Sequence, residues 1–355
     1  MNLKTIFPKK KVLSIDIGSY EIKVVEGKET KNGVKVDNHF SILTPEDAYM
    51  DGEILDKDLI YYVLNEKIKN KKIRTKDVYL TINSSSIITR EVTIPKVEEE
   101  EIENILKFQI EEYIPTESKD YVVQYKIIDN MYQDNVEKLN VLLIAVPQDI
   151  IECHFQLIKD LDLNPLVLDY QPNSIAKVIK TNSFVNNTYP TENITFAAID
   201  LGYNNTKVSI IQNGVIIVSR IIEMGMKHID QNILNFFNYT FEELEEKKLE
   251  IVDISRIEEK YDDYNRLVNI VRNSIENLND RIDIVFRYYL SREVDNKINI
   301  ILLYGGGANI GGLPSLFSNY FDIPTIKVES FDNIVFSGNM SKYINSIGSI
   351  IRLEV

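Results

Sequence analysis

The hydrophobic residues near the start of the chain fall into short runs that are separated by turn residues. Val12–Asp16 is an apolar run that ends at an acid, Ile17–Ser19 contains a glycine, and Ile22–Glu26 resumes residues of high β-propensity. This pattern predicts a β-hairpin, with Val34–Ile42 as a further strand. The next apolar residues, over Leu55–Ile68, recur at helical spacing and predict a helix.

After two further strands, Val78–Ile82 and Ile87–Ile94, the pattern changes to an alternation of helix and strand. We interpret Glu91–Leu161 as a compact β-α-β-β-α insert. Its predicted parts are a helix at Glu98–Tyr113, strands at Tyr121–Ile128 and Leu139–Val146 joined by the polar stretch Asp129–Lys138, and a helix at Gln148–Leu161.

The following segment returns to single strands and turns. Asn164–Leu168 predicts a strand, Asp169–Pro172 a turn before a helix, and Thr181–Thr191 a polar linker. The second half then repeats the start, with strands at Ile194–Asp200 and Lys207–Ile211. Further elements are helices at Met226–Phe237, Phe241–Glu250 and Asp263–Arg292, a strand at Ile298–Tyr304, and a helix from Pro314 to Tyr320.

A short motif occurs twice in register. Asp16-Ile17-Gly18 is followed by Lys23-Val24, and 184 positions later (200 − 16) Asp200-Leu201-Gly202 is followed by Lys207-Val208. Each copy lies between two predicted strands. A repeat at half the chain length indicates two similar halves, whereas solenoids have much shorter periods.

The context of this motif excludes two common nucleotide folds. Walker loops and dinucleotide fingerprints lead from a glycine turn into a helix, whereas each Asp-x-Gly turn here leads into a strand. A glycine hairpin tip can still offer backbone N–H groups to a phosphate. Its aspartate repels phosphate and is suited to hold Mg²⁺ through water.

A third glycine-rich segment, Gly305–Pro314, follows the strand that ends at Tyr304. Five of the 14 glycines of the chain fall within the eight positions 305–312. Glycines allow a ligand to approach the backbone closely, and a loop between a strand and a helix suits the sugar and α-phosphate of a nucleotide.

Composition and charge narrow the function further. A chain of 355 residues is long enough for about two units. The net charge of −14 argues against nucleic acid as the main partner. The single Cys153 and three scattered histidines make a His/Cys metal centre improbable. Because the longest apolar runs are strand-sized and no targeting segment is visible, we expect a soluble protein.

Together these residues resemble the actin-like ATPase superfamily, whose duplicated, ribonuclease H-like α/β fold closes around a nucleotide. The phosphate motifs are Asp16–Ser19 and Asp200–Thr206, the adenosine motif is Gly305–Pro314, and the connecting motifs are Asp169–Ala176 and Ser346–Ile351. The resemblance implies four subdomains: a first core (1–90 and 162–192), an insert (91–161), a second core (193–225 and 298–355) and a helical part (226–297).

Within that superfamily the chain resembles the FtsA/PilM branch, and most closely the PilM family of cytoplasmic type IV pilus assembly proteins. The insert segments Thr89–Pro95, Gln109–Pro115 and Val141–Pro147 carry this resemblance, together with the strand Ser219–Gly225. Because the sequence runs only to Val355, without the linker and amphipathic helix usual in FtsA, we expect the PilM branch. Tyr20 departs from the small or hydroxyl residue usual in the family.

The resemblance implies that ATP and Mg²⁺ lie between the halves, with Asp16 and Asp200 holding hydrated Mg²⁺. Gln171 is the candidate for positioning the attacking water, and we expect slow hydrolysis or none. The implied nucleotide-binding residues are Asp16, Gly18, Ser19, Tyr20, Lys23, Asp200, Gly202, Tyr203, Asn204, Asn205, Gly225, Gly305, Gly306, Gly307 and Asn309.

The resemblance also implies a partner, the N-terminal cytoplasmic peptide of the inner-membrane protein PilN. It would dock in a groove beside the insert, with Val92–Pro95 and Gln109–Pro115 as candidate walls. The protein would then be cytoplasmic and recruited to the inner face of the cell membrane. Self-association stays open, as do three alternatives: an FtsA-like division filament protein, a small-molecule kinase of the same superfamily, and a relative of the cytoplasmic part of GspL.

Overall fold

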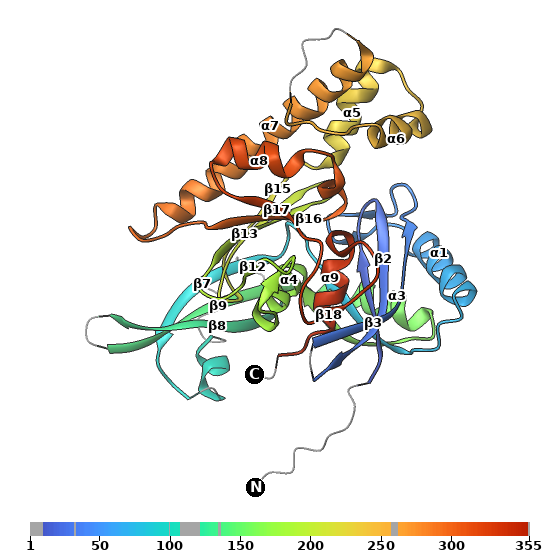
Figure 1. Cartoon of the computed structure of the whole chain (residues 1–355). Coiled ribbons are helices and arrows are strands. Elements are labelled where there is room, and N and C mark those ends of the chain that lie inside the picture. The colour runs from blue at the N-terminus through green and yellow to red at the C-terminus, as the bar shows by residue number, and fades with distance from the viewer. Residues whose placement is uncertain are drawn as a thin grey trace.

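Two mixed sheets, one from each half of the chain, form the core of the molecule (Figure 1). The computed structural model describes residues 10–31, 33–98, 100–106, 121–133, 136–256 and 262–353. The first sheet has the order β10-β6-β1-β2-β3-β18. Its strands are β1 (Val12–Ile17), β2 (Glu21–Thr30), β3 (Gly33–Leu43), β6 (Asp77–Ile82), β10 (Asn164–Tyr170) and β18 (Ile334–Val335).

The second sheet repeats this arrangement and has the order β15-β14-β13-β16-β17. In both sheets the first strand pairs antiparallel with the next strand and parallel with a later one. β1 and β13 are buried along their whole length, as expected for central strands with both faces covered. The strands are β13 (Thr195–Leu201), β14 (Thr206–Gln212), β15 (Val215–Ile222), β16 (Ile300–Tyr304) and β17 (Thr325–Lys327).

Two helices, α4 (Gln171–Thr181) and α9 (Met340–Ile350), cross between the sheets near the centre of Figure 1. They pack closely because a side chain at Gly348 would overlap the carbonyl of Ser174. The apolar cluster around them draws Val25 from the first sheet and Phe196 from the second. The two halves therefore share one core through these helices.

A third sheet, with the order β7-β9-β8, forms the insert. Its strands are β7 (Ile88–Pro95), β8 (Tyr121–Gln133) and β9 (Val136–Pro147). β9 is covered on both faces: Val141 and Leu143 pack with the helical residues 100–106, and Leu142 and Ile144 pack toward the first core. This two-sided burial explains the continuous apolar run at 141–146.

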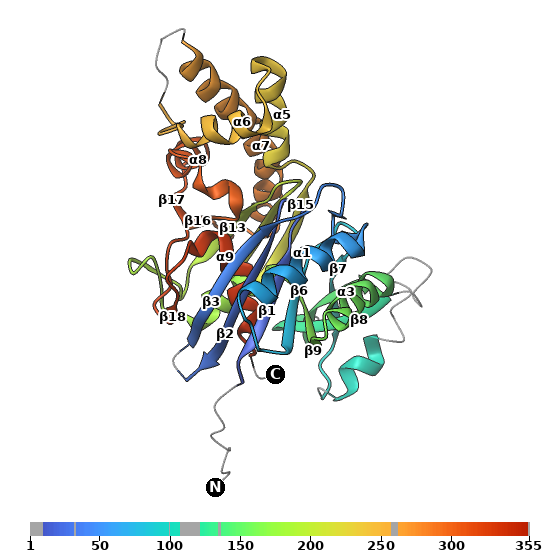
Figure 2. The ribbon, with the colours of Figure 1, turned by 90° about the vertical axis from the view of Figure 1, so that its right-hand side faces the viewer.

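The remaining labelled helices divide between the two halves, as Figures 1 and 2 show. Near the first sheet lie α1 (Lys57–Asn70) and α3 (Gln148–Asp160). On the second half lie α5 (Met226–Phe237), α6 (Phe241–Leu249), α7 (Asp263–Leu290) and α8 (Leu313–Phe321). None of the helices in the described ranges is long and apolar enough to span a bilayer.

Three sequence-based predictions differ from the structure. The turn predicted at Asp169–Pro172 is absent, because β10 stays paired with β6 to Tyr170 and α4 starts directly at Gln171. Pro172 fits the first helical turn, where no intrahelical N–H is needed. The linker predicted at Thr181–Thr191 contains a small hairpin of β11 (Phe184–Val185) and β12 (Tyr189–Pro190).

The third difference is the polar stretch Asp129–Lys138, which was predicted to join two strands. β8 and β9 instead continue into it, and their pairing reaches Gln133 and Val136. These paired ends of β8 and β9 extend past β7, and most of their described side chains are exposed. Polar residues suit such strands, so hydrophobic alternation was a poor guide to their ends. Two small strands, β4 (Tyr49–Met50) and β5 (Glu53–Ile54), form another hairpin.

Candidate functional site

A cavity of about 460 Å³ lies where the turns of the two halves converge. Its walls come from the β1–β2 turn, the β13–β14 turn, the glycine-rich loop after β16, and helices α5, α6 and α9. The sequence-predicted residues that line it are Asp16, Gly18, Ser19, Tyr20, Lys23, Gln171, Asp200, Gly202, Tyr203, Asn204, Asn205, Gly305, Gly306, Gly307 and Asn309.

Gly225 is the predicted site residue that is not part of this lining. It lies behind the β13–β14 turn, where a side chain would overlap the backbone of residues 202–205. The backbone of the same region is tied together because Met226 N–H donates to the carbonyl of Gly202 over 3.0 Å. Gly225 therefore supports the turn from behind, and its direct contact with a ligand stays a prediction.

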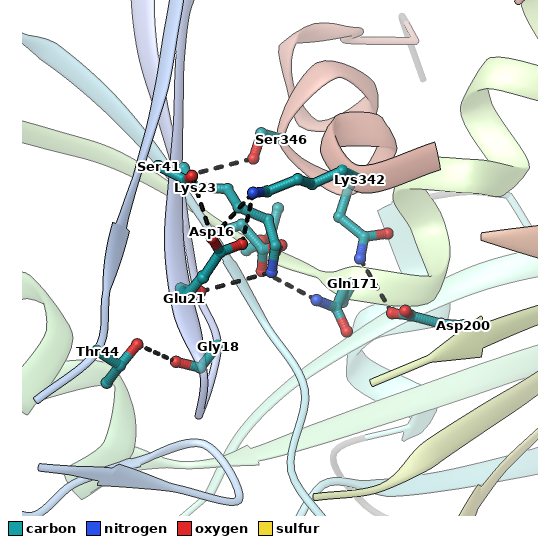
Figure 3. Close-up of polar contacts among 12 residues, drawn as sticks. Asp16, Gly18, Glu21, Lys23, Ser41, Thr44, Gln171, Asp200, Lys342 and Ser346 are labelled. Carbon is teal, nitrogen blue, oxygen red and sulfur yellow. Dashed lines mark hydrogen bonds and ion pairs between the residues drawn. The ribbon is translucent and has the colours of Figure 1, made fainter. Parts of the chain in front are cut away.

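Asp16 lines the cavity, near the end of β1. Its side chain is almost fully buried and accepts a hydrogen bond from Thr81 Oγ1 over 2.9 Å. It accepts a second one from Gln171 Nε2, also over 2.9 Å (Figure 3). Lys23, its register partner on β2, places Nζ 3.9 Å from the carboxylate. Two hydrogen-bond donors and one lysine therefore hold the Asp16 carboxylate in place.

Asp200 occupies the corresponding position in the second half. Its register partner Lys207 places Nζ 3.4 Å from Oδ2, and Asn345 Nδ2 donates to the same oxygen over 3.1 Å. Both Asp200 and Asn345 are almost fully buried. The two halves therefore repeat side chains as well as backbone structure, because each half supplies one aspartate and one lysine, and each aspartate is bonded by one side-chain amide.

The two turns carry tyrosines that meet at the cavity. The rings of Tyr20 and Tyr203 have centroids 4.8 Å apart. Burial, with nearby carboxylates, raises the pKa of the Tyr20 phenol to about 12, so it stays neutral. Tyr20, which departs from the family pattern, thus contacts the opposite turn and contributes to closing this side of the cavity.

The glycine-rich loop is shaped by contact with Asp200. Gly305 has φ 87°, and a side chain there would overlap the Asp200 carboxylate, so both the conformation and the space require glycine. The Gly305 N–H donates to the Ser341 carbonyl of α9 over 2.8 Å. At Gly306 nothing lies within 4 Å of an added Cβ, which leaves the backbone open to a ligand.

Sequence reasoning missed one wall of the cavity, formed by α5 and α6. Lys248 of α6 donates to the buried Asp230 of α5 over 2.9 Å. Burial raises the pKa of Asp230, and the Lys248 ammonium opposes that effect. Apolar residues Ile229, Leu249 and Ile251 lie beside this pair. An apolar surface with polar groups at its edge suits a flat heterocycle.

Other missed residues come from both halves. Lys207 carried a sequence signal, since it repeats Lys23, whereas Glu21, Lys342 and Asn345 lie outside the repeated motif. Lys342 of α9 pairs with Glu21 of β2, with Nζ 2.7 Å from Oε2 (Figure 3). This ion pair connects α9 to the first hairpin at the cavity wall.

The donor set suits a hydrated magnesium ion better than a directly bound metal. Across the described ranges, no group of three or more His, Cys, Asp and Glu side chains is arranged to hold a metal. Beside Asp16 and Asp200 lie two further acceptors, the buried oxygens Gln171 Oε1 and Asn345 Oδ1, neither of which has a hydrogen-bonding partner. Carboxylate and carbonyl oxygens are the acceptors that the waters of Mg²⁺ require.

The structure revises the candidate walls of the peptide groove. Val92 and Ile94 are buried inside the insert, against Ile102 and Leu106, so they offer no surface to a peptide. Only Pro95 is an exposed apolar residue within Val92–Pro95. The other candidate wall, Gln109–Pro115, lies outside the described residues.

Comparison with known protein families matches nearly the whole chain to one family model. The model of the family described as "Type IV pilus assembly protein PilM" matches residues 14–346. This span includes both Asp-x-Gly turns, the insert and the glycine-rich loop.

Comparison with solved structures gives the same fold. The chain is similar to a chain of the "PilM-PilN type IV pilus biogenesis complex", with a TM-score of 0.78, 18% identity, and coverage of 97% of this chain and 98% of that one. It is also similar to the ethanolamine utilization protein EutJ from Carboxydothermus hydrogenoformans (TM-score 0.59, 14% identity, 98% and 91% coverage). A third similar structure is MreB5 of Spiroplasma citri bound to ADP (TM-score 0.54, 14% identity, 96% and 94% coverage). The actin-like fold predicted from the sequence is confirmed.

Proposed function

The chain belongs to the PilM family of actin-like type IV pilus assembly proteins, and from that premise we propose that it binds ATP with Mg²⁺ between its halves and the N-terminal peptide of PilN beside its insert. One observation carries the nucleotide proposal. Two copies of an Asp-Lys hairpin and a glycine-rich loop, which are far apart in sequence, line a single cavity. A similar structure, that of MreB5, holds ADP.

The phosphates would lie between the two hairpin turns. Backbone N–H groups around Gly18 and Gly202 would donate to phosphate oxygens, and Lys23 and Lys207 would offset the negative charge. When bound, Mg²⁺ supplies charge neutralisation at the phosphates. Asp16 and Asp200 would accept hydrogen bonds from its water ligands, and their own hydrogen bonds keep both carboxylates in place.

The adenosine would lie along Gly306, Gly307 and Asn309, toward the wall formed by α5 and α6. The open backbone at Gly306 allows the sugar to approach, and the apolar residues Ile229 and Ile251 offer a surface for the base. A nucleotide that contacts both halves at once would favour one closed arrangement of the two halves. This closure is a means by which nucleotide would change the affinity for a partner.

Hydrolysis depends on Gln171, the residue that starts α4. Its Nε2 is committed to Asp16, so its carbonyl Oε1 is the atom left to orient a water. We propose that Gln171 orients the attacking water and that turnover is slow. The direct test of the nucleotide proposal is an equilibrium titration with ATP: saturable binding supports it, and absence of binding at millimolar ATP contradicts it.

For PilN we propose a docking place at the junction of the insert with the first sheet. β8 and β10 are edge strands of their sheets, and edge strands can accept an extended peptide. Val122 of β8 and Leu166 of β10 are apolar and exposed. Ile128 of β8 and Leu168 of β10 pack in the same apolar cluster, so the two strands lie near each other.

Two features support this docking place over the rest of the surface. The insert is the part that departs from the duplicated core, and one of the similar structures contains PilN. The peptide would anchor by burying a few aliphatic side chains, at about 25 cal/mol per Å² before ordering costs. Binding to PilN would recruit the protein to the inner face of the cell membrane.

A further inference from the structure

Asn345 lines the cavity and connects the two halves. The helix that carries it, α9, packs on β1, β2 and β6 of the first sheet. Its Asn345 side chain nevertheless donates to Asp200, at the end of β13 in the second half, over 3.1 Å. The side chain is almost fully buried and lines the cavity, and no part of the repeated motif accounts for it.

The orientation of this amide is fixed by chemistry. A carboxylate only accepts hydrogen bonds, so the NH₂ group of Asn345 must face Asp200 and the carbonyl oxygen must point away from it. The same argument fixes Gln171 on Asp16, and Figure 3 shows Gln171 between Asp16 and Asp200. Both carbonyl oxygens, Gln171 Oε1 and Asn345 Oδ1, are buried and have no hydrogen-bonding partner.

A buried carbonyl oxygen without a hydrogen-bonding partner is unfavourable, so two of them at matching places in a duplicated site indicate a ligand that donates hydrogen bonds. The neighbouring acceptors, Asp16 and Asp200, call for a cationic donor. A hydrated divalent cation meets both requirements, because each of its waters donates two hydrogen bonds. Phosphate does not, since its oxygens accept.

We propose that Asn345 is a positioning residue for the metal. Its Oδ1 accepts a hydrogen bond from a water of Mg²⁺, while its NH₂ group orients Asp200. This inference rests on the proposed binding of Mg²⁺ with ATP. It assigns to the second half the counterpart of Gln171, and it gives α9 a direct role in the site.

Calorimetric titration with ATP in EDTA and at a series of Mg²⁺ concentrations tests this role. In wild type, the affinity for ATP should rise with Mg²⁺. In Asn345→Ala that gain should fall roughly tenfold or more, which is the worth of a hydrogen bond to a charged group, while the affinity in EDTA changes little. Ser349→Ala is the matched control: Ser349 is buried on the same helix and bonds Ser14 instead of the cavity.

Asn345→Asp separates metal positioning from a structural role. Aspartate keeps an acceptor oxygen but cannot donate to Asp200, so a purely structural Asn345 would make this variant worse than Asn345→Ala. We expect the opposite: the Mg²⁺-dependent gain returns, and affinity in EDTA falls because a negative charge is added beside the phosphates. A wild-type Mg²⁺ dependence in Asn345→Ala, or no return in Asn345→Asp, would overturn the inference. Failure of wild type to bind ATP under any condition would instead overturn the proposed function on which it rests.

Discussion

Lys207 lies directly opposite Asp200 in the β13–β14 pair, with Nζ 3.4 Å from the carboxylate. Lys23 holds the same relation to Asp16 in the β1–β2 pair, at 3.9 Å. Each lysine is paired and mostly buried, yet both line the cavity. The duplication therefore provides two cations at the place where the phosphates of a nucleotide would lie.

We expect Lys207→Met to weaken ATP binding about tenfold or more, because it removes one charge-assisted contact. Lys23→Met should have an effect of similar size. Lys76→Met is the control, since Lys76 pairs with Asp162 on an exposed surface. Calorimetry decides the matter: a Lys207→Met protein with the affinity of the Lys76→Met control would exclude the second-half lysine from the site.

Gln171→Ala should remove whatever ATP hydrolysis the protein has and leave ATP binding in EDTA nearly unchanged. The reason is that Gln171 Oε1 is the atom available to orient a water, whereas the Gln171 amide contacts Asp16 on its other side. The measurement is phosphate release at saturating ATP, with a no-protein control. Equal release by wild type and variant, above that control, would remove Gln171 from the mechanism.

Val122→Glu and Leu166→Glu should each weaken binding of a PilN N-terminal peptide at least tenfold, because they place a charge on an apolar contact. Both side chains are exposed, so the fold should tolerate the changes. Leu59→Glu, on α1 and similarly exposed, is the matched control. Fluorescence anisotropy with a labelled peptide measures the effect. Unchanged affinity in both variants would place the docking site elsewhere.

His154 should make the protein less stable in acid. It is fully buried, its Nδ1–H donates to the Ile150 carbonyl, and its Nε2 lies 3.4 Å from the hydroxyl of Tyr49. Burial lowers its pKa from 6.5 to about 4. The neutral form is therefore favoured in the folded state, and its contribution is complete above pH 6.5 and declines toward pH 4.

The decline attributable to His154 is roughly 3 kcal/mol in the free energy of unfolding over that range. Other groups also titrate there, so the informative comparison is with His154→Gln, which cannot be protonated. Urea denaturation at pH 7.5 and 4.5 should show a smaller loss of stability for the variant. An equal loss in both proteins would contradict the assignment to His154.

The local parts of the site could be predicted from the sequence, because a strand, a glycine turn and a second strand adjoin one another along the chain. This holds for Asp16–Lys23, for Asp200–Lys207 and for the loop after Tyr304. The duplicated fold followed from the same repeat. The apolar run at 141–146 likewise identified a buried strand of the insert.

The parts assembled by tertiary packing could not be predicted. Asn345 and Lys342 reach the cavity because α9 crosses between the sheets, and Asp230 and Lys248 reach it because α5 packs beside α6. Their sequence neighbourhoods show ordinary helical periodicity. Val92 and Ile94 were misjudged as surface because alternation alone does not tell which face of an insert strand a helix covers.

The central claim is that the two halves hold one Mg²⁺·ATP between Asp16 and Asp200, and calorimetry on Asp16→Asn and Asp200→Asn tests it most directly. Asparagine preserves the volume, whereas alanine at Asp16 would also leave Thr81 and Gln171 without their acceptor. We predict that wild type binds one ATP with an affinity that rises with Mg²⁺, and that each variant loses this dependence while remaining folded by circular dichroism. Wild-type Mg²⁺·ATP affinity in both variants would contradict the account.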